Sequence, residues 1–170
     1  MALQKKICML GAFAVGKTSL VRRYVDSIFS DRYLTTVGVK IDKRMVTVGG
    51  SEVSLILWDI AGEDDISQVR TSYVRGAAGY LLVVDGTRPG TIDVAQSIQQ
   101  RVEAEVGELP FVVLLNKRDL QSLWSVSAEH IAALEFTGWT VQLTSALSGE
   151  GVEEAFQALA ERVIVSRQAR

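Results

Sequence analysis

The chain is 170 residues long, a length that predicts a single domain spanning residues 1–170. Apolar residues make up 48% of the chain and charged residues 22%, a balance typical of a globular protein with its own buried core. The formal net charge of -2 argues against a nucleic-acid-binding protein, because such proteins rely on many lysine and arginine contacts with phosphates.

The two ends of the chain carry no pattern for membrane attachment. The segment MALQKKICML leads directly into an apolar strand pattern and lacks the features of a signal peptide. Ala2 stands where myristoylation requires glycine, the last residues SRQAR contain no cysteine for prenylation, and every apolar run is far shorter than the ~20 residues of a membrane span. The single cysteine, Cys8, excludes an internal disulfide. We therefore expect a cytoplasmic protein without a membrane segment or lipid motif, with peripheral membrane association if a tail has been truncated.

Several short segments have the character of β-strands. Most are nearly continuous apolar runs, as expected for strands that are covered on both faces. The pair Gly49-Gly50 predicts a hairpin between a more polar strand and an apolar one, because glycine readily adopts positive φ. In chain order the predicted strands are Ile7–Leu10, Lys40–Val48, Val53–Trp58, Tyr80–Val84, Phe111–Leu115 and Val141–Leu143.

Helical patterns alternate with these strands. One follows Gly16, a second has apolar residues three and four positions apart over Ala95–Val102, a third begins at Ser127, and the last follows Gly151. This alternation, with one hairpin, predicts an α/β domain whose sheet is mostly parallel. Ligands bind beyond the carboxyl ends of the strands in such sheets, so the loops at those ends are the candidates for a functional site.

The segment Gly11–Thr18 lies between the first strand and the first helix and matches the pattern G-x-x-x-x-G-K-[ST]. Its glycines allow a tight turn in which backbone N–H groups point at an anion, and the helix N-terminus adds its positive dipole end. Lys17 supplies a charge for the β- and γ-phosphates of a nucleotide, and the Thr18 hydroxyl suits Mg²⁺. The pattern predicts a P-loop NTPase; the alternative is a glycine-rich turn without a ligand. The phosphates would contact Phe13, Ala14, Val15, Gly16, Lys17, Thr18 and Ser19.

A second motif, Asn116-Lys117-Arg118-Asp119, follows the apolar strand Phe111–Leu115. The Asp119 carboxylate can accept hydrogen bonds from both N1–H and the exocyclic amine of guanine, whereas adenine presents an acceptor at N1. Asp119 therefore selects guanine by leaving the wrong base unpaired. Asn116 offers a donor and an acceptor to the base and to neighbouring loops, and the aliphatic stem of Lys117 can lie over the base plane. The alternative for this motif alone is an exposed helix cap.

With these two motifs the chain resembles the Ras/Rab-type small GTPases over essentially all of its length. Tyr33–Val39 is similar to the family's switch I, Trp58–Gly62 to its W-D-x-A-G motif, and Thr144–Ala146 is a further match. Arg70–Gly79 is most similar to the Rab branch. The resemblance implies a six-stranded, mostly parallel sheet that has helices on both faces, with Lys40–Val48 as its antiparallel strand.

The resemblance also implies how the γ-phosphate and its metal are held. In the GTP-bound state Thr36 would ligate Mg²⁺ and contact the γ-phosphate, Asp59 would hold Mg²⁺ through water, and the Gly62 N–H would contact the γ-phosphate. Loss of that phosphate would release both loops, the order–disorder switch of this class. The implied metal ligands are Thr18, Thr36 and Asp59, and the implied catalytic set is Lys17, Thr36, Gly62 and Glu63.

The resemblance also implies which residues contact the guanine base and which segments bind partner proteins. Phe29 would lie edge-on to guanine, the Ala146 N–H would read guanine O6, and Ser145 would orient Asp119. The implied cofactors are GTP or GDP with Mg²⁺. Effector and regulator proteins would bind through Tyr33–Ile41 and Asp59–Arg75.

Two departures from the family pattern fall at the chemistry. Glu63 stands where relatives have the glutamine that positions the attacking water, and an ionised glutamate can accept but not donate. Phe13 replaces a glycine or small residue, and its ring could crowd the γ-phosphate or the space for an arginine finger. These changes predict slow or regulator-dependent GTP hydrolysis. In a rival interpretation Glu63 has a raised pKa and acts as a general base; in another, both side chains point to solvent.

Three functions are therefore compared. The first is a GTPase switch, and the second is a nucleotide-bound interaction module without significant turnover. The third, a phosphate-loop kinase, lacks an arginine-rich lid in the sequence and conflicts with the guanine-selecting Asn116–Asp119 motif.

Overall fold

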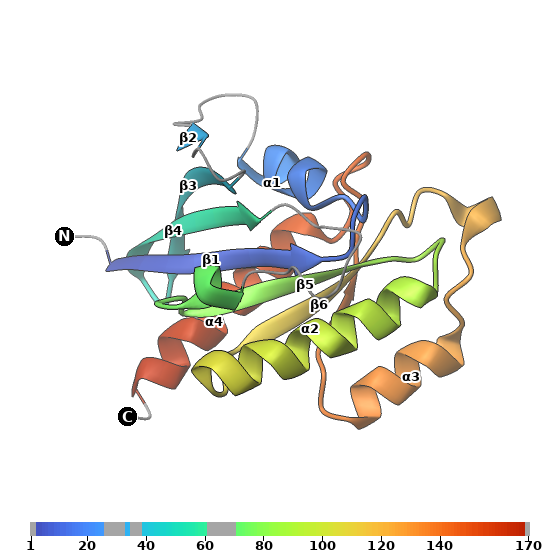
Figure 1. Cartoon of the computed structure of the whole chain (residues 1–170). Coiled ribbons are helices and arrows are strands. Elements are labelled where there is room, and N and C mark those ends of the chain that lie inside the picture. Colours follow the sequence, from blue (N-terminus) through green and yellow to red (C-terminus); the bar gives the residue numbers. More distant parts are fainter. Residues whose placement is uncertain (1–2, 26–32, 35–38, 61–70, 169–170) are drawn as a thin grey trace.

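The computed structural model describes residues 3–25, 33–34, 39–60 and 71–168. Within them, seven strands form one sheet in the order β2-β3-β4-β1-β5-β6-β7 (Figure 1). Strands β1 and β4 to β7 are mutually parallel where they pair, and β3 is antiparallel to β4. The strands are β1 (Leu3–Gly11), β2 (Tyr33–Leu34), β3 (Val39–Val48), β4 (Ser51–Ile60), β5 (Gly79–Asp85), β6 (Phe111–Asn116) and β7 (Val141–Leu143).

All six predicted strands are present, and the fold class is confirmed. The predicted hairpin joins β3 and β4 through Gly49 and Gly50, whose φ angles of 56° and 81° are of the kind that glycine adopts without steric strain. The described sheet differs from the predicted one by an additional strand, β2, which has two residues and is antiparallel to β3 at the sheet edge. Two paired residues are too few to show the period-2 pattern that identifies a strand in a sequence.

The described residues form four α-helices, each in a segment where the sequence predicts one; three lie between strands and the fourth follows the last strand. The α3 helix begins after Ser127, whose side chain caps it: Ser127 Oγ accepts from the His130 N–H, and the Ser127 N–H donates to His130 Nδ1. Two short 3-10 helices are η2 (Thr71–Val74) and η3 (Gln121–Leu123). The α-helices are α1 (Lys17–Val25), α2 (Gly90–Val106), α3 (Ala128–Phe136) and α4 (Val152–Gln168).

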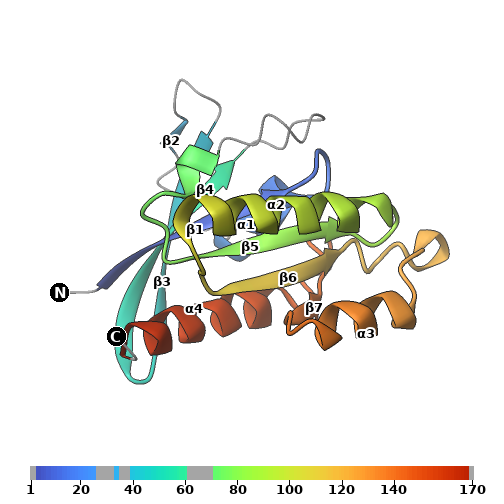
Figure 2. The same ribbon diagram turned by 60° about the horizontal axis from the view of Figure 1, so that its bottom comes forward.

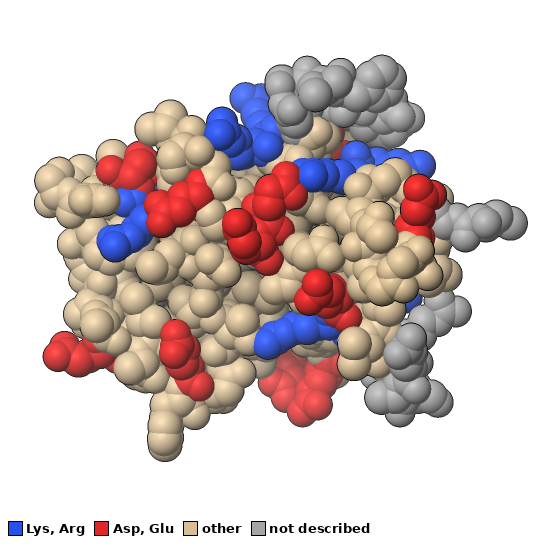
Figure 3. All heavy atoms as spheres, turned by 180° about the vertical axis from the view of Figure 1, so that it is seen from behind, with Lys and Arg blue, Asp and Glu red and all other residues tan. Residues whose placement is uncertain are grey.

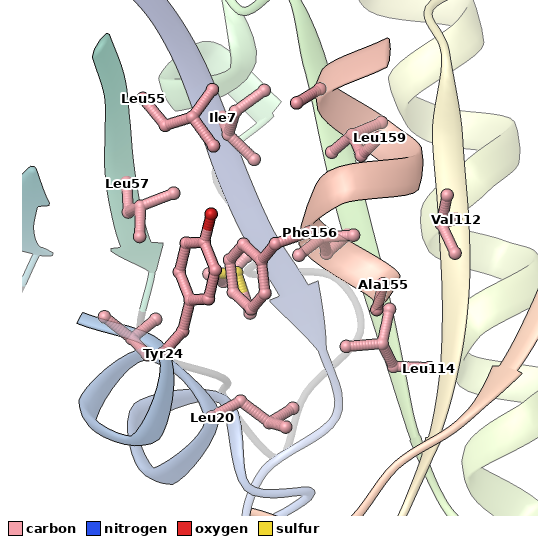
Figure 4. Close-up of a cluster of buried hydrophobic side chains, with 14 of the residues drawn as sticks. Ile7, Leu20, Tyr24, Leu55, Leu57, Val112, Leu114, Ala155, Phe156 and Leu159 are labelled. Atoms are coloured by element: carbon pink, nitrogen blue, oxygen red, sulfur yellow. The ribbon is translucent and has the colours of Figure 1, made fainter. Parts of the chain in front are cut away.

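The helices make three layers with the sheet, because apolar side chains project from both sheet faces. Figure 2 shows α2 and α4 on opposite sides of β5 and β6. On one side α1 and α4 bury a cluster in which the rings of Tyr24 and Phe156 stack with centroids 3.7 Å apart (Figure 4). On the other side α2 packs over the sheet, and α3 contributes Leu134 near β7. None of the described helices is long and apolar enough to cross a bilayer.

The parallel strands bring distant loops to one edge of the molecule. The carboxyl ends of β1, β4, β5, β6 and β7 point the same way, since these strands are parallel to their neighbours. The loops that follow them carry both motifs found in the sequence. The candidate site therefore lies at the edge where ligands bind in open α/β sheets.

Candidate functional site

The loop between β1 and α1 is built around two glycines that no other residue could replace without strain. Gly11 has a φ of 153°, and a side-chain Cβ there would lie 2.5 Å from the Val83 carbonyl oxygen of β5. Gly16 has a φ of 104°, and a Cβ there would collide with the Asn116 side-chain amide. The phosphate-binding pattern thus reflects close approach of this loop to β5 and to the loop after β6.

Lys17 begins α1 and is folded back over this loop. Its ammonium group donates to the carbonyl oxygens of Gly11, at 3.1 Å, and Ala12, at 3.0 Å, and the residue is 6% exposed. Burial lowers the pKa of Lys17 to about 8, while the nearby Asp59 carboxylate opposes that effect. An ammonium has three N–H donors, so two hold the loop and a third remains to meet an anion.

Two oxygen atoms that could serve as metal ligands lie near Lys17. The Thr18 hydroxyl donates to Asp59 Oδ2 at 2.6 Å, and Asp59 is 5% exposed near the end of β4. A hydroxyl and a carboxylate are ligands that Mg²⁺ prefers, and Mg²⁺ sites in nucleotide enzymes commonly combine one or two such groups with phosphate oxygens. The pair therefore fits the predicted metal site in its donor chemistry.

Asn116, at the end of β6, connects three loops. Its Nδ2 donates to the Val15 carbonyl oxygen at 3.0 Å, and its Oδ1 accepts from the Thr144 hydroxyl at 3.2 Å and from the Ala146 N–H at 3.3 Å. It is 1% exposed, so these bonds satisfy an amide that water does not reach. The phosphate loop and the predicted base-reading loops are therefore joined by one side chain.

The carboxylate of Asp119, predicted to bind the base, is oriented by a neighbouring serine. Ser145 Oγ donates to Asp119 Oδ1 at 2.7 Å, which fixes the carboxylate and leaves its other oxygen for a second donor. This contact agrees with the orienting role that the resemblance implies for Ser145. The Ala146 N–H, predicted to read guanine O6, contacts Asn116 Oδ1 in this structure.

Lys117 joins the base-reading loop to the phosphate loop. Its ammonium group donates to the Ala14 carbonyl oxygen at 3.0 Å and pairs with Asp85 Oδ2 at 2.9 Å. Ala14 and Lys117 have φ angles of 60° and 71°, the positive-φ non-glycine residues of the described chain. Such left-handed conformations persist where surrounding contacts impose them, and they concentrate at ligand sites.

These contacts bring the predicted phosphate loop, the predicted metal ligands Thr18 and Asp59 and the predicted base-reading loop to one edge of the sheet. Comparison with known proteins agrees: the model of the Ras family matches residues 6–165. The chain belongs to the Ras family.

Curated relatives place the chain near the Rab proteins. It is 36% identical over 169 residues to the Ras-related protein Rab-7L1 of Rattus norvegicus, an alignment covering 94% of this chain and 81% of the relative. The Ras-related protein RabJ of Dictyostelium discoideum is 34% identical, in an alignment that covers 98% of this chain and 66% of the relative. The Ras-related protein Rab-13 of Canis lupus familiaris is 33% identical, in an alignment that covers 97% of this chain and 82% of the relative. The chain thus spans about two thirds of RabJ and about four fifths of the other two. As a Ras/Rab-type small GTPase it is a guanine-nucleotide-binding switch protein.

Most of the predicted Ras-family site residues lie together around the phosphate loop. Phe13 is at the tip of this loop and is 57% exposed. Other predictions lie outside the described residues: Phe29, Thr36, Gly62, Glu63, and large parts of the segments Tyr33–Ile41 and Asp59–Arg75.

Asp85, the acidic residue that ends β5, also lies at this edge, although neither sequence motif includes it. It is fully buried, and its carboxylate accepts from the Thr87 N–H and hydroxyl and from the Arg88 and Lys117 side chains. The available signal was a charged residue directly after the apolar run Tyr80–Val84, at the sheet edge where ligands bind.

Asp85 gives the site a specific response to acid. Burial by itself would raise the pKa of Asp85, but hydrogen bonds from Lys117, Thr87 and Arg88 outweigh it and lower the pKa to about 2. Its contribution to stability is therefore present above the unfolded-state pKa of about 4 and is lost as the pH falls towards 2. We expect Asp85→Asn to lower the free energy of unfolding at pH 7 by about 2 kcal/mol, and this difference to shrink at pH 3. Urea titrations of both proteins at the two pH values measure it; an equal difference at both would contradict the assignment.

Proposed function

We propose that this protein binds one GDP or GTP with Mg²⁺ and hydrolyses GTP slowly, as a switch that regulators control. The supporting observation is the hydrogen bond from Asn116 Nδ2 to the Val15 carbonyl oxygen, at 3.0 Å. It joins the loop that would bind phosphates to the loop that would read guanine, so one ligand would span both. Residues 1–170 are proposed to act as a single nucleotide-binding domain.

The proposed base site selects guanine through Asp119 and the loop after β7. Asp119 would accept from guanine N1–H and the exocyclic amine, with Ser145 holding the carboxylate at 2.7 Å. Lys117, anchored to Ala14 and Asp85, would lay its stem over the base. The Ala146 N–H would exchange its long 3.3 Å contact with Asn116 for guanine O6, and Phe29 would lie at the edge of the base.

The proposed metal site uses Thr18 and Asp59, with Thr36 as a third ligand in the GTP state. The hydroxyl and carboxylate oxygens are 2.6 Å apart, close enough to bind one ion together. When bound, Mg²⁺ would neutralise charge on the β- and γ-phosphates. Lys17 would orient the same phosphates from the other side of the loop, and the Gly62 N–H would meet the γ-phosphate.

Slow hydrolysis is proposed because of Glu63 and Phe13. An ionised Glu63 cannot donate to the transferring phosphoryl group and adds negative charge beside an anionic nucleotide. The Phe13 side chain is more than half exposed in the predicted phosphate loop, and there it would crowd the space that a regulator's arginine would enter. These two residues also favour the second candidate, a nucleotide-bound interaction module without significant turnover.

Single-turnover GTP hydrolysis by the wild type and Glu63→Gln tests this part of the proposal. We expect a low wild-type rate and a rise of roughly 5-fold in the variant, which corresponds to the ~1 kcal/mol between two unit charges 4 Å apart in water. A fast wild-type rate without gain in Glu63→Gln would contradict it. A slower variant would instead support Glu63 as a general base, and no hydrolysis by either protein would favour the interaction module.

Partner proteins are proposed to bind through Tyr33–Ile41 and Asp59–Arg75. Within the described parts, Trp58 and Tyr73 are half-buried and pack at the margin of a core cluster, and Lys6 lies over the Trp58 ring at 3.7 Å. Both aromatic side chains thus combine core packing with an exposed edge that a partner could contact.

Lysine, arginine, aspartate and glutamate side chains are interspersed on the face shown in Figure 3, so this face offers mixed charge rather than a basic tract.

A further inference from the structure

The Asp85 carboxylate fixes a second cation besides Lys117. Arg88 Nε donates to Asp85 Oδ2 at 2.9 Å, and Arg88 Nη2 donates to the Phe13 carbonyl oxygen at 2.8 Å. The guanidinium group therefore contacts a buried anion on one side and the backbone of the phosphate loop on the other. Its rigid, planar arrangement of donors allows this two-directional contact.

The backbone of Arg88 is itself held in place. Its N–H donates to the Asp85 carbonyl oxygen at 3.0 Å, and its own carbonyl oxygen accepts from the Thr91 hydroxyl at 2.7 Å and the Thr91 N–H at 3.0 Å. Thr91 Oγ1 also accepts from the Asp85 N–H at 3.0 Å. The turn between β5 and α2 thus orients Arg88 through its own hydrogen bonds.

The part of the phosphate loop that Arg88 contacts needs support. Phe13 and Ala14 present consecutive carbonyl oxygens to two cations, Arg88 and Lys117, which both pair with Asp85. Ala14 has a φ of 60°, a conformation that is strained for a residue with a Cβ. When carbonyl groups are held away from the centre of a loop, the N–H groups of the same peptides can point inwards, where an anion binds.

We propose that Arg88 is a positioning residue for the nucleotide phosphates: anchored by Asp85, it holds the Phe13 carbonyl and so keeps the phosphate loop in its anion-binding form. This inference rests on the proposed function, since it assigns Arg88 to the phosphate side of the same site. The Arg88 side chain is 45% exposed, so water competes with its contacts and its effect is moderate.

Dissociation of fluorescently labelled GDP, measured with Mg²⁺ present, tests the proposal. We expect Arg88→Ala to release GDP about 3- to 10-fold faster, as suits the loss of a charge-assisted but partly exposed hydrogen bond. Arg162→Ala is the matched control, because Arg162 Nη1 also donates from an exposed side chain to a backbone carbonyl, that of Phe111, at the opposite end of β6. The control should release GDP at the wild-type rate. Equal rates for Arg88→Ala and Arg162→Ala would overturn the proposal.

A comparison of ligands separates positioning from general loss of structure. Arg88→Ala should reduce the preference for GDP over GMP, which tests the phosphate side, and leave the preference for GDP over inosine diphosphate unchanged, which tests the base side. A uniform loss for all three ligands, or an unchanged preference for GDP over GMP, would contradict a positioning role.

Arg88→Lys gives a second test in a variant that keeps the charge. An ammonium at the end of a flexible chain cannot reproduce the planar contact with both Asp85 and Phe13, so the variant should recover part of the wild-type rate. Full recovery would show that charge alone suffices and would contradict the proposal. If the wild type bound no guanine nucleotide, the proposed function would fail as well; if it bound GDP and the Arg88 variants matched it, this inference alone would fail.

Discussion

We expect the substitution Asp119→Asn to weaken GDP binding about 100-fold and to make xanthosine diphosphate the better ligand. The carboxylate accepts from two donors on guanine, and charge-assisted hydrogen bonds of this kind contribute about 1.5–3 kcal/mol each. An asparagine would still accept from N1–H, but its amide group would face the exocyclic amine of guanine, donor against donor. Xanthine has a carbonyl at that position, so it matches asparagine. Competition of GDP or of xanthosine diphosphate with a bound fluorescent nucleotide measures this change in ligand preference.

The structure offers a control for this experiment. Asp93 is an exposed carboxylate in the first turn of α2, away from the loops after β6 and β7, and Asp93→Asn should retain wild-type selectivity. Undiminished GDP affinity in Asp119→Asn would show that Asp119 does not contact the base, even though Ser145 holds it at 2.7 Å.

The second large effect is expected for Lys17→Met, which should weaken nucleotide binding without destabilising the nucleotide-free protein. The ammonium group would be lost from the phosphates, which should weaken GDP binding about 100-fold or more. Burial lowers the pKa of Lys17 to about 8, which shows that the charged form is disfavoured where it lies. Methionine has a similar length and no charge to desolvate, so the nucleotide-free protein should be as stable as the wild type or more stable.

Calorimetric titration with GDP and urea unfolding of the nucleotide-free protein measure the two quantities. Lys43→Met is the control, since Lys43 is exposed on β3 and should change neither. A large loss of stability in Lys17→Met, parallel to the loss of binding, would mean that Lys17 acts mainly by holding the Gly11 and Ala12 carbonyls.

The sheet could be predicted because its central strands have unusually clear sequences. All seven residues of β5 are buried, and in β6 all but Phe111 are, so burial on both faces shows as a continuous apolar run. The β3–β4 hairpin was equally visible, since both residues at its turn are glycines with positive φ. β2 could not be found, because pairing of two residues depends on where β3 lies rather than on local pattern.

The site could be predicted where a motif fixes both residue type and spacing. The phosphate loop and the Asn116–Asp119 segment are of this kind. Ala14 and Lys117 adopt positive φ without being glycine, and no local rule indicates that; tertiary contacts impose it. Asp85 and Arg88 were missed for a related reason. Their roles come from the meeting of β5, β6 and the phosphate loop, and each residue alone reads as an ordinary charge in a turn.

Some expectations concern residues outside the described structure and stay predictions. Thr36 and Gly62 are expected at the γ-phosphate, Phe29 at the base, and Glu63 at the attacking water. Of the proposed phosphate and metal ligands, Lys17, Thr18 and Asp59 lie near one another in the described structure, and Trp58–Ile60 precedes the segment that contains Gly62 and Glu63.

Displacement of labelled GDP from the wild-type protein by GTP or ATP, with Mg²⁺ present, tests the central claim that the two motifs form one guanine-nucleotide site. We expect stoichiometric binding of labelled GDP, displacement by GTP, and at least about a 100-fold higher concentration for displacement by ATP, because adenine leaves Asp119 unpaired. Equal displacement by ATP, or no binding of labelled GDP, would contradict it.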